Sequence, residues 1–390
     1  MHYSERELMF ALIRYEVCDM GLFADFEKSL TPDIISKAFE LAYPQDMSHI
    51  IASAALNLGI DIPDELKQKL ERSQMTAVYR HALLRHELAR VCATLEEEKI
   101  PYIPLKGSVL RSYYKRPEMR TSCDIDVFVS EENLDRAAKA FEERLSYELD
   151  VRTPHDVAFY SKSKTHVELH FDLIERDEKV KCVLERVWEL SHTDGNEYRH
   201  LMNRELFFAY HVAHMAKHFM GGGCGLRPLL DLWIIEHKMG YDKAVAEELV
   251  SAMGLEKFAR EALALSEVWF SGKEPTATTK QMEDYILGGG VYGSAENRMA
   301  AMQTVRGGKF RYVMGRIFLP FSRLKKIYPR LEKYPILLPY YEVKRWLSYL
   351  SRKGISAGRS ELKAYSSVAD EKQISVSALF KELELEIPRI

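Results

Sequence analysis

The sequence is poor in cysteine, and none of its cysteines is spaced like a metal-ligand pair. The five cysteines stand at positions 18, 92, 123, 182 and 224 of 390 residues, and no two form a C-x-x-C pair. An odd number of widely spaced cysteines argues against a disulfide framework and against a zinc knuckle. No apolar run reaches about 18 residues, and no N-terminal apolar segment with a cleavage site is found. We therefore expect a cytoplasmic protein without a transmembrane segment.

An excess of charge of one sign is also missing. Lys and Arg number 55 against 58 Asp and Glu, which gives a formal net charge of −3. No global field therefore points toward nucleic acid or a membrane surface. Hydrophobic residues make up 46% and charged residues 29% of the chain, a composition typical of globular proteins. The length is enough for two or three domains.

Helical periodicity dominates both ends of the chain, and strands are expected only in between. A period of 3.6 residues runs through the first hundred residues and returns after Asp172. From Tyr102 to Asp172 the chain has short apolar or alternating segments, "PYIPL", "CDIDVFV", "YELDVR", "VAFYSK" and "THVELHFDL", which are typical of strands. The sequence predicts an α+β fold, with a small mixed sheet in a mostly helical chain.

Four regions are expected along the chain. They are an N-terminal helical region at 1–85, a core with the strands at 86–195, a helical domain at 196–300 and a basic, aromatic C-terminal helical region at 301–390. Within the last region, residues 304–353 hold thirteen Lys or Arg, two Glu and ten aromatics. That segment either binds an anionic polymer or membrane surface, or is the solvated basic face of amphipathic helices.

Two aspartates, Asp124 and Asp126, lie in the apolar segment "CDIDVFV". Side chains alternate along a strand, so the two carboxylates face the same way, about 7 Å apart, while Cys123, Ile125 and Val127 face the core. A strand interior disfavours aspartate, and like charges so close repel each other. A hard cation such as Mg²⁺, which prefers oxygen ligands, would relieve that repulsion.

The segment "THVELHFDL" places Glu168, His170 and Asp172 on one face of a strand. If this strand lies beside "CDIDVFV", Glu168 becomes a third carboxylate at the same site, with Asp172 as the alternative. His170 either belongs to the site or is a hydrogen-bonded structural histidine. Three carboxylates with two metal ions are typical of phosphoryl or nucleotidyl transfer.

The segment "LKGSVL" follows a strand and opens a helix, as a phosphate-binding turn does. Gly107 allows close approach of a ligand to the backbone, and Ser108 offers a hydroxyl. The helix N-terminus offers N–H groups and the positive end of its dipole, and Lys106 can add charge. Arg120, four residues before Asp124, either holds a phosphate or pairs with a carboxylate.

A helix expected at 203–220 carries three histidines, His211, His214 and His218, on one face. They suit a zinc site poorly, because no cysteine or fourth ligand lies nearby. The alternatives are a pocket wall near the nucleotide, with Lys217 or His218 touching phosphate or base, and ordinary packing. Three glycines, 221–223, are expected to end this helix.

The strand, glycine–serine turn, helix and Asp-x-Asp strand resemble the signature of the DNA polymerase β-type nucleotidyltransferase superfamily. More narrowly, "PLKGSVLRSYY…PEMRTSCDIDVFV" with "VELHFDL" is similar to a large, mostly uncharacterised bacterial nucleotidyltransferase family with L-K-G, D-I-D and E-L-H motifs. The resemblance covers about residues 83–350, with sharp motifs only between 104 and 172. It implies metal-dependent transfer of a nucleoside monophosphate from an NTP to an acceptor, with release of pyrophosphate.

The resemblance carries over to individual residues. Gly107 and Ser108 match the glycine–serine turn, which makes residues 106–108 nucleotide-binding. Asp124 and Asp126 match the metal ligands, and Glu168 matches the third carboxylate, at a two-ion site for Mg²⁺ or Mn²⁺. The chain departs from the superfamily in two ways: fifteen residues separate Ser108 from Asp124, a little more than usual, and residue 106 is a lysine where many members carry an apolar residue.

The acceptor is open at this stage. A small hydroxylated molecule, a peptide or protein side chain and an RNA end all fit, and the oligomeric state is unknown. Two rival functions also remain: a transferase that uses a nucleotide-sugar donor and an Asp-x-Asp metal site, and a non-catalytic nucleotide-binding regulator with a misplaced third carboxylate.

Overall fold

A computed structural model describes residues 4–22, 26, 29–173, 177–291, 293–306, 319, 321, 324–325, 328, 330–349 and 370–385. Much of the basic segment 304–353 lies outside the described residues, so its two interpretations stay predictions. The division of the chain into four regions also stays a prediction.

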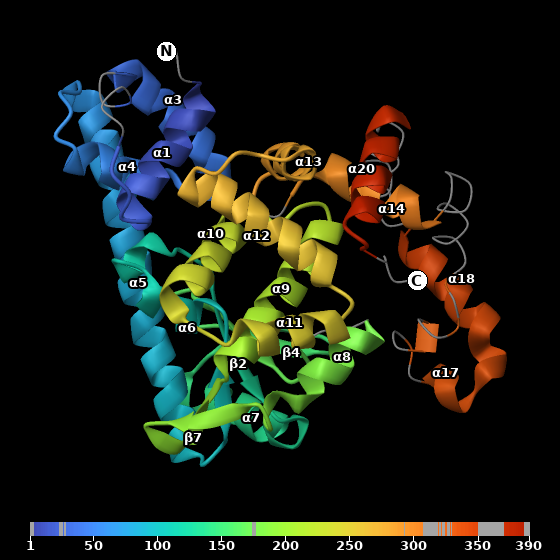
Figure 1. The fold of residues 1–390 in the computed structure, drawn as a ribbon. Helices are drawn as coiled ribbons and strands as arrows, with labels where there is room; N and C mark the ends of the chain where they lie inside the picture. The colour runs from blue at the N-terminus through green and yellow to red at the C-terminus, as the bar shows by residue number, and fades with distance from the viewer. Residues whose placement is uncertain are drawn as a thin grey trace.

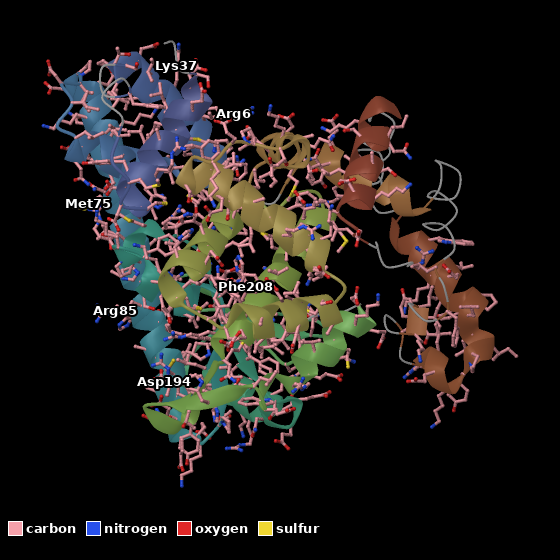
Figure 2. The ribbon with its side chains drawn as sticks, in the orientation of Figure 1. Arg6, Lys37, Met75, Arg85, Asp194 and Phe208 are labelled. Carbon is pink, nitrogen blue, oxygen red and sulfur yellow. The ribbon has the colours of Figure 1, made fainter. Side chains whose placement is uncertain are left out.

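The N-terminal region is helical, as predicted. Its helices are α1 (Glu5–Val17), α3 (Pro32–Ala42), α4 (Ser48–Asn57) and α5 (Asp64–Glu97). Ser4 and Glu7 form a capping box at the start of α1: the Ser4 N–H donates to the Glu7 carboxylate (2.8 Å), and the Glu7 N–H donates to the Ser4 hydroxyl (3.3 Å). Helix α5 runs along one side of the molecule from these helices to the sheet, and Arg85 on it points outward (Figures 1 and 2).

The strands are those predicted, with one hairpin added. They are β1 (Tyr102–Pro104), β2 (Asp124–Val129), β3 (Glu148–Arg152), β4 (Asp156–Tyr160), β5 (His166–His170), β6 (Ser191–Asp194) and β7 (Asn196–Met202). Among the described residues the order across the sheet is β3-β4-β5-β2-β1-β7-β6. Strands β2 and β5 are parallel, whereas β1–β2, β3–β4 and β4–β5 are antiparallel. The sheet is therefore mixed, as predicted.

Helices cover both faces of the sheet (Figure 1). On one face, α5 and α7 (Leu134–Leu145) bury Ile125 and Val127 of β2 in a core with Phe141 and Phe159. On the other face, Phe128 belongs to the larger core built around α9 (Arg204–Met220). Cys123, which was expected to face the core, is exposed because β2 begins only at the next residue.

The hairpin of β6 and β7 was missed, because helices were expected to follow Asp172 directly. One helix, α8 (Glu178–Leu184), does follow, and then the chain turns at Gly195 between the two strands. Gly195 has a φ of 81°, a conformation that favours glycine. The sequence signal was the Asp194–Gly195 pair, a common hairpin turn.

The second half of the chain is helical. After α9 come α10 (Arg227–Ile234), α11 (Lys243–Ala252), α12 (Glu256–Ser271), α13 (Ala277–Leu287), α14 (Ala295–Arg306), α17 (Arg330–Lys333), α18 (Leu338–Tyr349) and α20 (Asp370–Glu382). Helix α9 ends at Gly221, as predicted. Phe208 of α9 lies in the middle of the molecule (Figure 2). Within the part of the chain that the structure describes, no helix has the length and apolarity needed to cross a bilayer.

Two glycine-containing segments, one directly after α9 and one directly before α14, lie very close to each other. The Ser294 N–H donates to the Gly222 carbonyl at 3.2 Å. A Cβ on Gly293 would lie 2.0 Å from that same carbonyl oxygen, and Gly293 also has a φ of 74°. Residue 293 must therefore be glycine for two reasons, the backbone conformation and the lack of space.

We predict that Gly293→Ala destabilises the protein far more than Gly195→Ala does. Both glycines have positive φ, so each substitution costs about 1 kcal/mol or more in backbone strain. Only Gly293 also meets a neighbouring backbone, because nothing lies within 4 Å of a Cβ at Gly195. Denaturant unfolding of both variants measures the difference, which we expect to exceed about 1 kcal/mol. Equal losses would show that the two segments are not closely packed.

Candidate active site

The parallel pairing of β2 and β5 builds the site. In this register Asp126 lies opposite Glu168, and Asp124 lies opposite His166. Side chains directly opposite each other on neighbouring strands share a face. The strand of "THVELHFDL" thus lies beside that of "CDIDVFV", which is the condition under which Glu168 was expected to join the site, and Glu168 stands next to Asp126.

Asp126, Glu168 and His170 form one compact group. The His170 Nε2 lies 2.9 Å from Asp126 Oδ1 and 3.1 Å from Glu168 Oε2. One ligand atom from each residue lies within 4.8 Å of the other two. Carboxylate oxygens and an imidazole nitrogen suit Mg²⁺, Mn²⁺ or other divalent ions, so the group could bind a metal. His170 is thus placed among the predicted metal ligands.

Lys106 reaches the same group from the turn after β1. Its Nζ lies 2.8 Å from Asp126 Oδ1. Burial opposes the charge on Asp126, but Lys106 and His170 outweigh it and hold the pKa of Asp126 well below its usual value. Lys106 has a φ of 44°, which is rare outside glycine and indicates a strained backbone at this position.

Asp124 differs from Asp126 in its electrostatics. It lies at the start of β2 and is only half-buried, outside the compact group. Burial and the nearby charge of Asp126 raise the pKa of Asp124, and Lys106 offsets this only in part. The like-charge repulsion expected from the sequence therefore raises the pKa of Asp124 and not that of Asp126, because Asp126 has Lys106 and His170 as partners.

His170 gains a proton more readily than an ordinary histidine. Burial disfavours its charged form, but hydrogen bonds to Asp126 and Glu168 outweigh burial and raise its pKa. A histidine must be neutral to bind a metal through its ring nitrogen. Metal binding at this group is therefore expected to release the His170 proton.

The predicted helix after Lys106 is a single turn, α6 (Gly107–Leu110), followed by a 3₁₀ turn. The Ser108 N–H already donates to the Leu105 carbonyl at 3.0 Å. A ligand would therefore find fewer free N–H groups than a long helix offers. No partner of the Ser108 hydroxyl is found among the described residues, so this hydroxyl is available to a phosphate.

Arg120 pairs with a carboxylate, one of the two alternatives that the sequence left open. Its Nε and Nη2 each donate to Asp231 of α10 at 2.7 Å. Tyr114 donates to the same carboxylate at 2.7 Å. A Cβ on Gly107 would lie 2.2 Å from Arg120 Nη1, so the glycine of the turn also makes room for this guanidinium. A phosphate contact of Arg120 stays a prediction.

Helix α9 brings two histidines to the site. The Nε2 atoms of His214 and His218 lie 3.2 Å apart. Burial, with Lys106 and Lys217 nearby, lowers the pKa of His218 to about 4. Both rings are therefore neutral at neutral pH, since the pKa of His214 is also lowered. Lys217 itself is exposed.

His211 does not share this arrangement. Its Nε2 lies 2.8 Å from the Pro228 carbonyl, close to the Arg120–Asp231 pair. The three histidines therefore do not converge on one metal ion. Tyr210, four residues before His214, lies on the same helix face as His214 and His218. It is buried, and the charges of Lys106 and Asp126 act on its hydroxyl.

Sequence reasoning missed Tyr210 and Asp231. The spacing of Tyr210, His214 and His218, four residues each, was the signal for the first, because it places them along one helix face. A lone aspartate in the apolar segment "RPLLDLWII" was the signal for the second, since a buried charge requires a partner. Asp172, the alternative third carboxylate, lies past the end of β5 and outside the compact group.

A comparison with protein families matches residues 36–271 to the family described as uncharacterised nucleotidyltransferase. The chain belongs to this family. The matched range runs from α3 to the end of α12 and includes the whole sheet and α9. A search of curated proteins found no match, and a search of solved structures found none either. The residues gathered around Asp126 lie within the matched range.

We predict different effects on stability for two substitutions in this protein. Asp126→Asn leaves Lys106 without its carboxylate and should cost about 3 kcal/mol, the loss typical of breaking a buried ion pair. Asp124→Asn removes a charge that burial disfavours, so the free energy of unfolding should stay unchanged or rise. Chemical denaturation at pH 7 without metal measures both. An equal loss in the two variants would contradict the difference in their surroundings.

A second prediction concerns the pH dependence of metal binding. Because His170 must lose its proton, Mn²⁺ affinity should rise with pH up to the raised pKa of His170, by about tenfold per pH unit for one released proton. Electron paramagnetic resonance of free Mn²⁺ measures the affinity. His170→Gln should flatten the dependence, whereas His237→Gln, a histidine paired with Glu267, should leave it intact. A flat profile in the unsubstituted protein would remove His170 from the metal site.

Proposed function

We propose that the protein is a metal-dependent nucleotidyltransferase that moves a nucleoside monophosphate from an NTP to an acceptor hydroxyl and releases pyrophosphate. The observation that carries the proposal is the Asp126–Glu168–His170 group beside the Lys106–Ser108 turn. The Leu105 N–H donates to the Asp126 carbonyl at 3.0 Å, which fixes this turn to β2 next to the carboxylates.

Asp124, Asp126 and Glu168 are the proposed ligands of Mg²⁺ or Mn²⁺ at a two-ion site, and His170 is proposed as a further ligand of the ion held by Asp126 and Glu168. When bound, the metal neutralises the triphosphate and lowers the pKa of the acceptor hydroxyl. Glu168 is more exposed than Asp126, with side-chain exposures of 24% and 4%. Glu168 is therefore better placed to take the proton of the acceptor.

The nucleotide is proposed to lie between the turn and α9. Gly107 and Ser108 face the phosphates. With a metal held by Asp126, the ammonium of Lys106 would pair with a phosphate oxygen in place of that carboxylate. Neutral His214 and His218 line the wall, and Lys217 adds positive charge at the rim. In the transfer, the acceptor oxygen bonds to the α-phosphorus while the bond from that phosphorus to the bridging oxygen breaks. The electron pair of that bond leaves with pyrophosphate.

One observation bears on the rival functions. A non-catalytic nucleotide-binding regulator was expected to lack the third carboxylate or to carry it elsewhere. Glu168 stands directly opposite Asp126, which favours a catalyst. A nucleotide-sugar donor stays the alternative to an NTP, because both carry the diphosphate that such a site binds.

We predict that Glu168→Gln lowers turnover by about 100-fold or more, the upper range for a lost acid–base or ligand role, while NTP affinity changes by less than about tenfold. Pyrophosphate release measures turnover, with Mg²⁺, each NTP and a cell extract as the source of acceptor. Thermal-shift titration measures NTP affinity. Glu148→Gln, an exposed β3 carboxylate paired with Lys164, serves as the matched control and should change neither quantity.

Two outcomes would contradict the proposal. Full turnover in Glu168→Gln would take the third carboxylate out of the reaction. Binding of Mg·NTP without pyrophosphate release in the unsubstituted protein would favour the regulator.

A further inference from the structure

A pocket of about 430 Å³ lies in the C-terminal part of the chain, outside the range matched to the nucleotidyltransferase family. Helix α17, the 3₁₀ turn η7 (Pro335–Leu337) and the first half of α18 form it. Figure 1 shows α17 and α18 well apart from the sheet, on the side of the molecule opposite α5. The residues that line the pocket are Arg330, Tyr334, Leu337, Tyr340, Tyr341 and Lys344. The pocket is therefore separate from the candidate active site.

One wall of the pocket belongs to a small hydrophobic core. Tyr341 is buried there together with Leu324 and Leu331. The ring of Tyr341 stacks on that of Tyr328, with 4.5 Å between the centroids and 26° between the planes. The Lys344 Nζ lies over these two rings, 5.8 Å from the centroid of Tyr328 and 6.0 Å from that of Tyr341. These contacts hold the wall and the ammonium of Lys344 in place.

Two other rings of the lining, those of Tyr334 and Tyr340, are open to solvent. Tyr334 is 53% exposed and Tyr340 is 60% exposed. Tyr340 meets Tyr341 edge-on, with 5.2 Å between the centroids and 76° between the planes. An edge-on contact leaves most of a ring's flat surface uncovered, and flat aromatic surfaces stack on planar molecules. The two exposed tyrosines therefore offer surface for a planar ligand.

The lining is positively charged. Arg330 and Lys344 are exposed cations, and among the described residues no carboxylate lines the pocket. The glutamates of α17 and α18 have their own partners: Glu332 pairs with a lysine outside the lining at 3.1 Å, and Glu342 pairs with Arg345 at 2.6 Å. The charge of the pocket is therefore complementary to an anion.

We propose that this pocket binds a single strand of nucleic acid, with bases stacked on Tyr334 and Tyr340 and phosphates paired with Arg330 and Lys344. Proteins that bind single strands combine cations that follow the phosphates with aromatic rings on which successive bases stack. The volume lies within the range of about 300–1,000 Å³ that is typical of ligand pockets. The inference goes beyond the proposed function and does not rest on it, because the pocket shares no residue with the candidate active site.

An anionic bilayer is the rival occupant, since cations beside exposed apolar residues also suit a membrane surface. The apolar residue on which a bilayer would depend is Ile336 of η7, which is 87% exposed. Ile336 does not line the pocket. The cations and tyrosines line a hollow instead, and a single base enters a hollow whereas a flat bilayer does not. The position of these groups therefore favours the strand, and Ile336 distinguishes the two occupants.

The test measures binding directly, with the full chain. The probe is a fluorescein-labelled oligouridylate of about ten nucleotides, within the site sizes of single-strand binders. Anisotropy with protein up to about 100 µM covers the weak affinities typical of binding without sequence preference. We expect saturable binding to the single strand. An RNA duplex of the same length should bind at least about fivefold more weakly, because its bases are paired and cannot stack on tyrosine. Vesicles of phosphatidylglycerol and phosphatidylcholine should not sediment with the protein.

Substitutions of the tyrosines test the stacking. Tyr334→Leu and Tyr340→Leu should each weaken binding about tenfold, as expected for the loss of one stacked base. Tyr340→Phe keeps the ring and should keep the affinity. Both tyrosines are exposed, so these variants are expected to fold, and thermal melting checks this.

Substitutions of the cations test the phosphate contacts. Each phosphate contact with a single strand contributes about −0.7 to the slope of log K against log salt concentration. Arg330→Gln should therefore make that slope shallower by about 0.7. Lys333→Gln removes an exposed cation of the same helix that does not line the pocket, so it should leave the slope unchanged. Ile336→Ser should leave both affinity and slope unchanged.

Four outcomes would overturn the proposal. The first is no binding of the oligouridylate, and the second is equal binding of single strand and duplex. The third is binding that neither tyrosine substitution weakens, which would reduce the contact to charge alone. The fourth is binding to the vesicles that Ile336→Ser abolishes while oligouridylate binding is absent, which would assign the surface to a bilayer.

Discussion

The register between β2 and β5 is the constraint on which the site depends. A shift of one residue would turn every side chain of one strand to the opposite face, and a shift of two would place a histidine opposite Asp126. The register is held from the other side of the sheet, where Ile125 and Val127 pack with Val167 and Leu169 beneath α5 and α7. The apolar face of these strands thus determines which charged groups meet on the polar face.

Two buried carboxylates of the described residues each have two partners. Asp126 has Lys106 and His170, and Asp231 has Arg120 and Tyr114. Replacing one partner of such a pair leaves an uncompensated charge, which is far more damaging than losing a surface pair. The second pair also joins α10 to the turn at Gly107, so the helical half of the chain supports the geometry of the phosphate-binding segment.

The sequence predicted the polar faces of β2 and β5, because strict alternation assigns a face to every residue of a strand. The α+β class and the five strands between Tyr102 and His170 followed from short apolar or alternating segments, and Glu168 was expected beside Asp126 if the two strands were neighbours. The contact of Lys106 with Asp126 could not be predicted, since it requires a lysine with positive φ, which no propensity favours.

Contacts between segments that are far apart along the chain could not be predicted from the sequence either. The pairing of Arg120 with Asp231 joins residues 111 positions apart, and alternation says nothing about such a distance. The hairpin after α8 was missed for another reason. Strands β6 and β7 form one edge of the sheet and carry many polar residues, so few buried apolar residues reveal them in the sequence.

Helix α5 imposes a condition on how the length of this chain can vary. Its 34 residues form one unbroken helix, with the first turns packed on α4 and the last turns beneath the sheet. One inserted residue in the middle would rotate one half against the other by about 100° and lengthen the helix by about 1.5 Å. An insertion of seven residues would restore the rotation to within about 20° but separate the two ends by about 10 Å. Relatives that keep both packing surfaces should therefore place their insertions and deletions in the loops and keep the length of this helix constant.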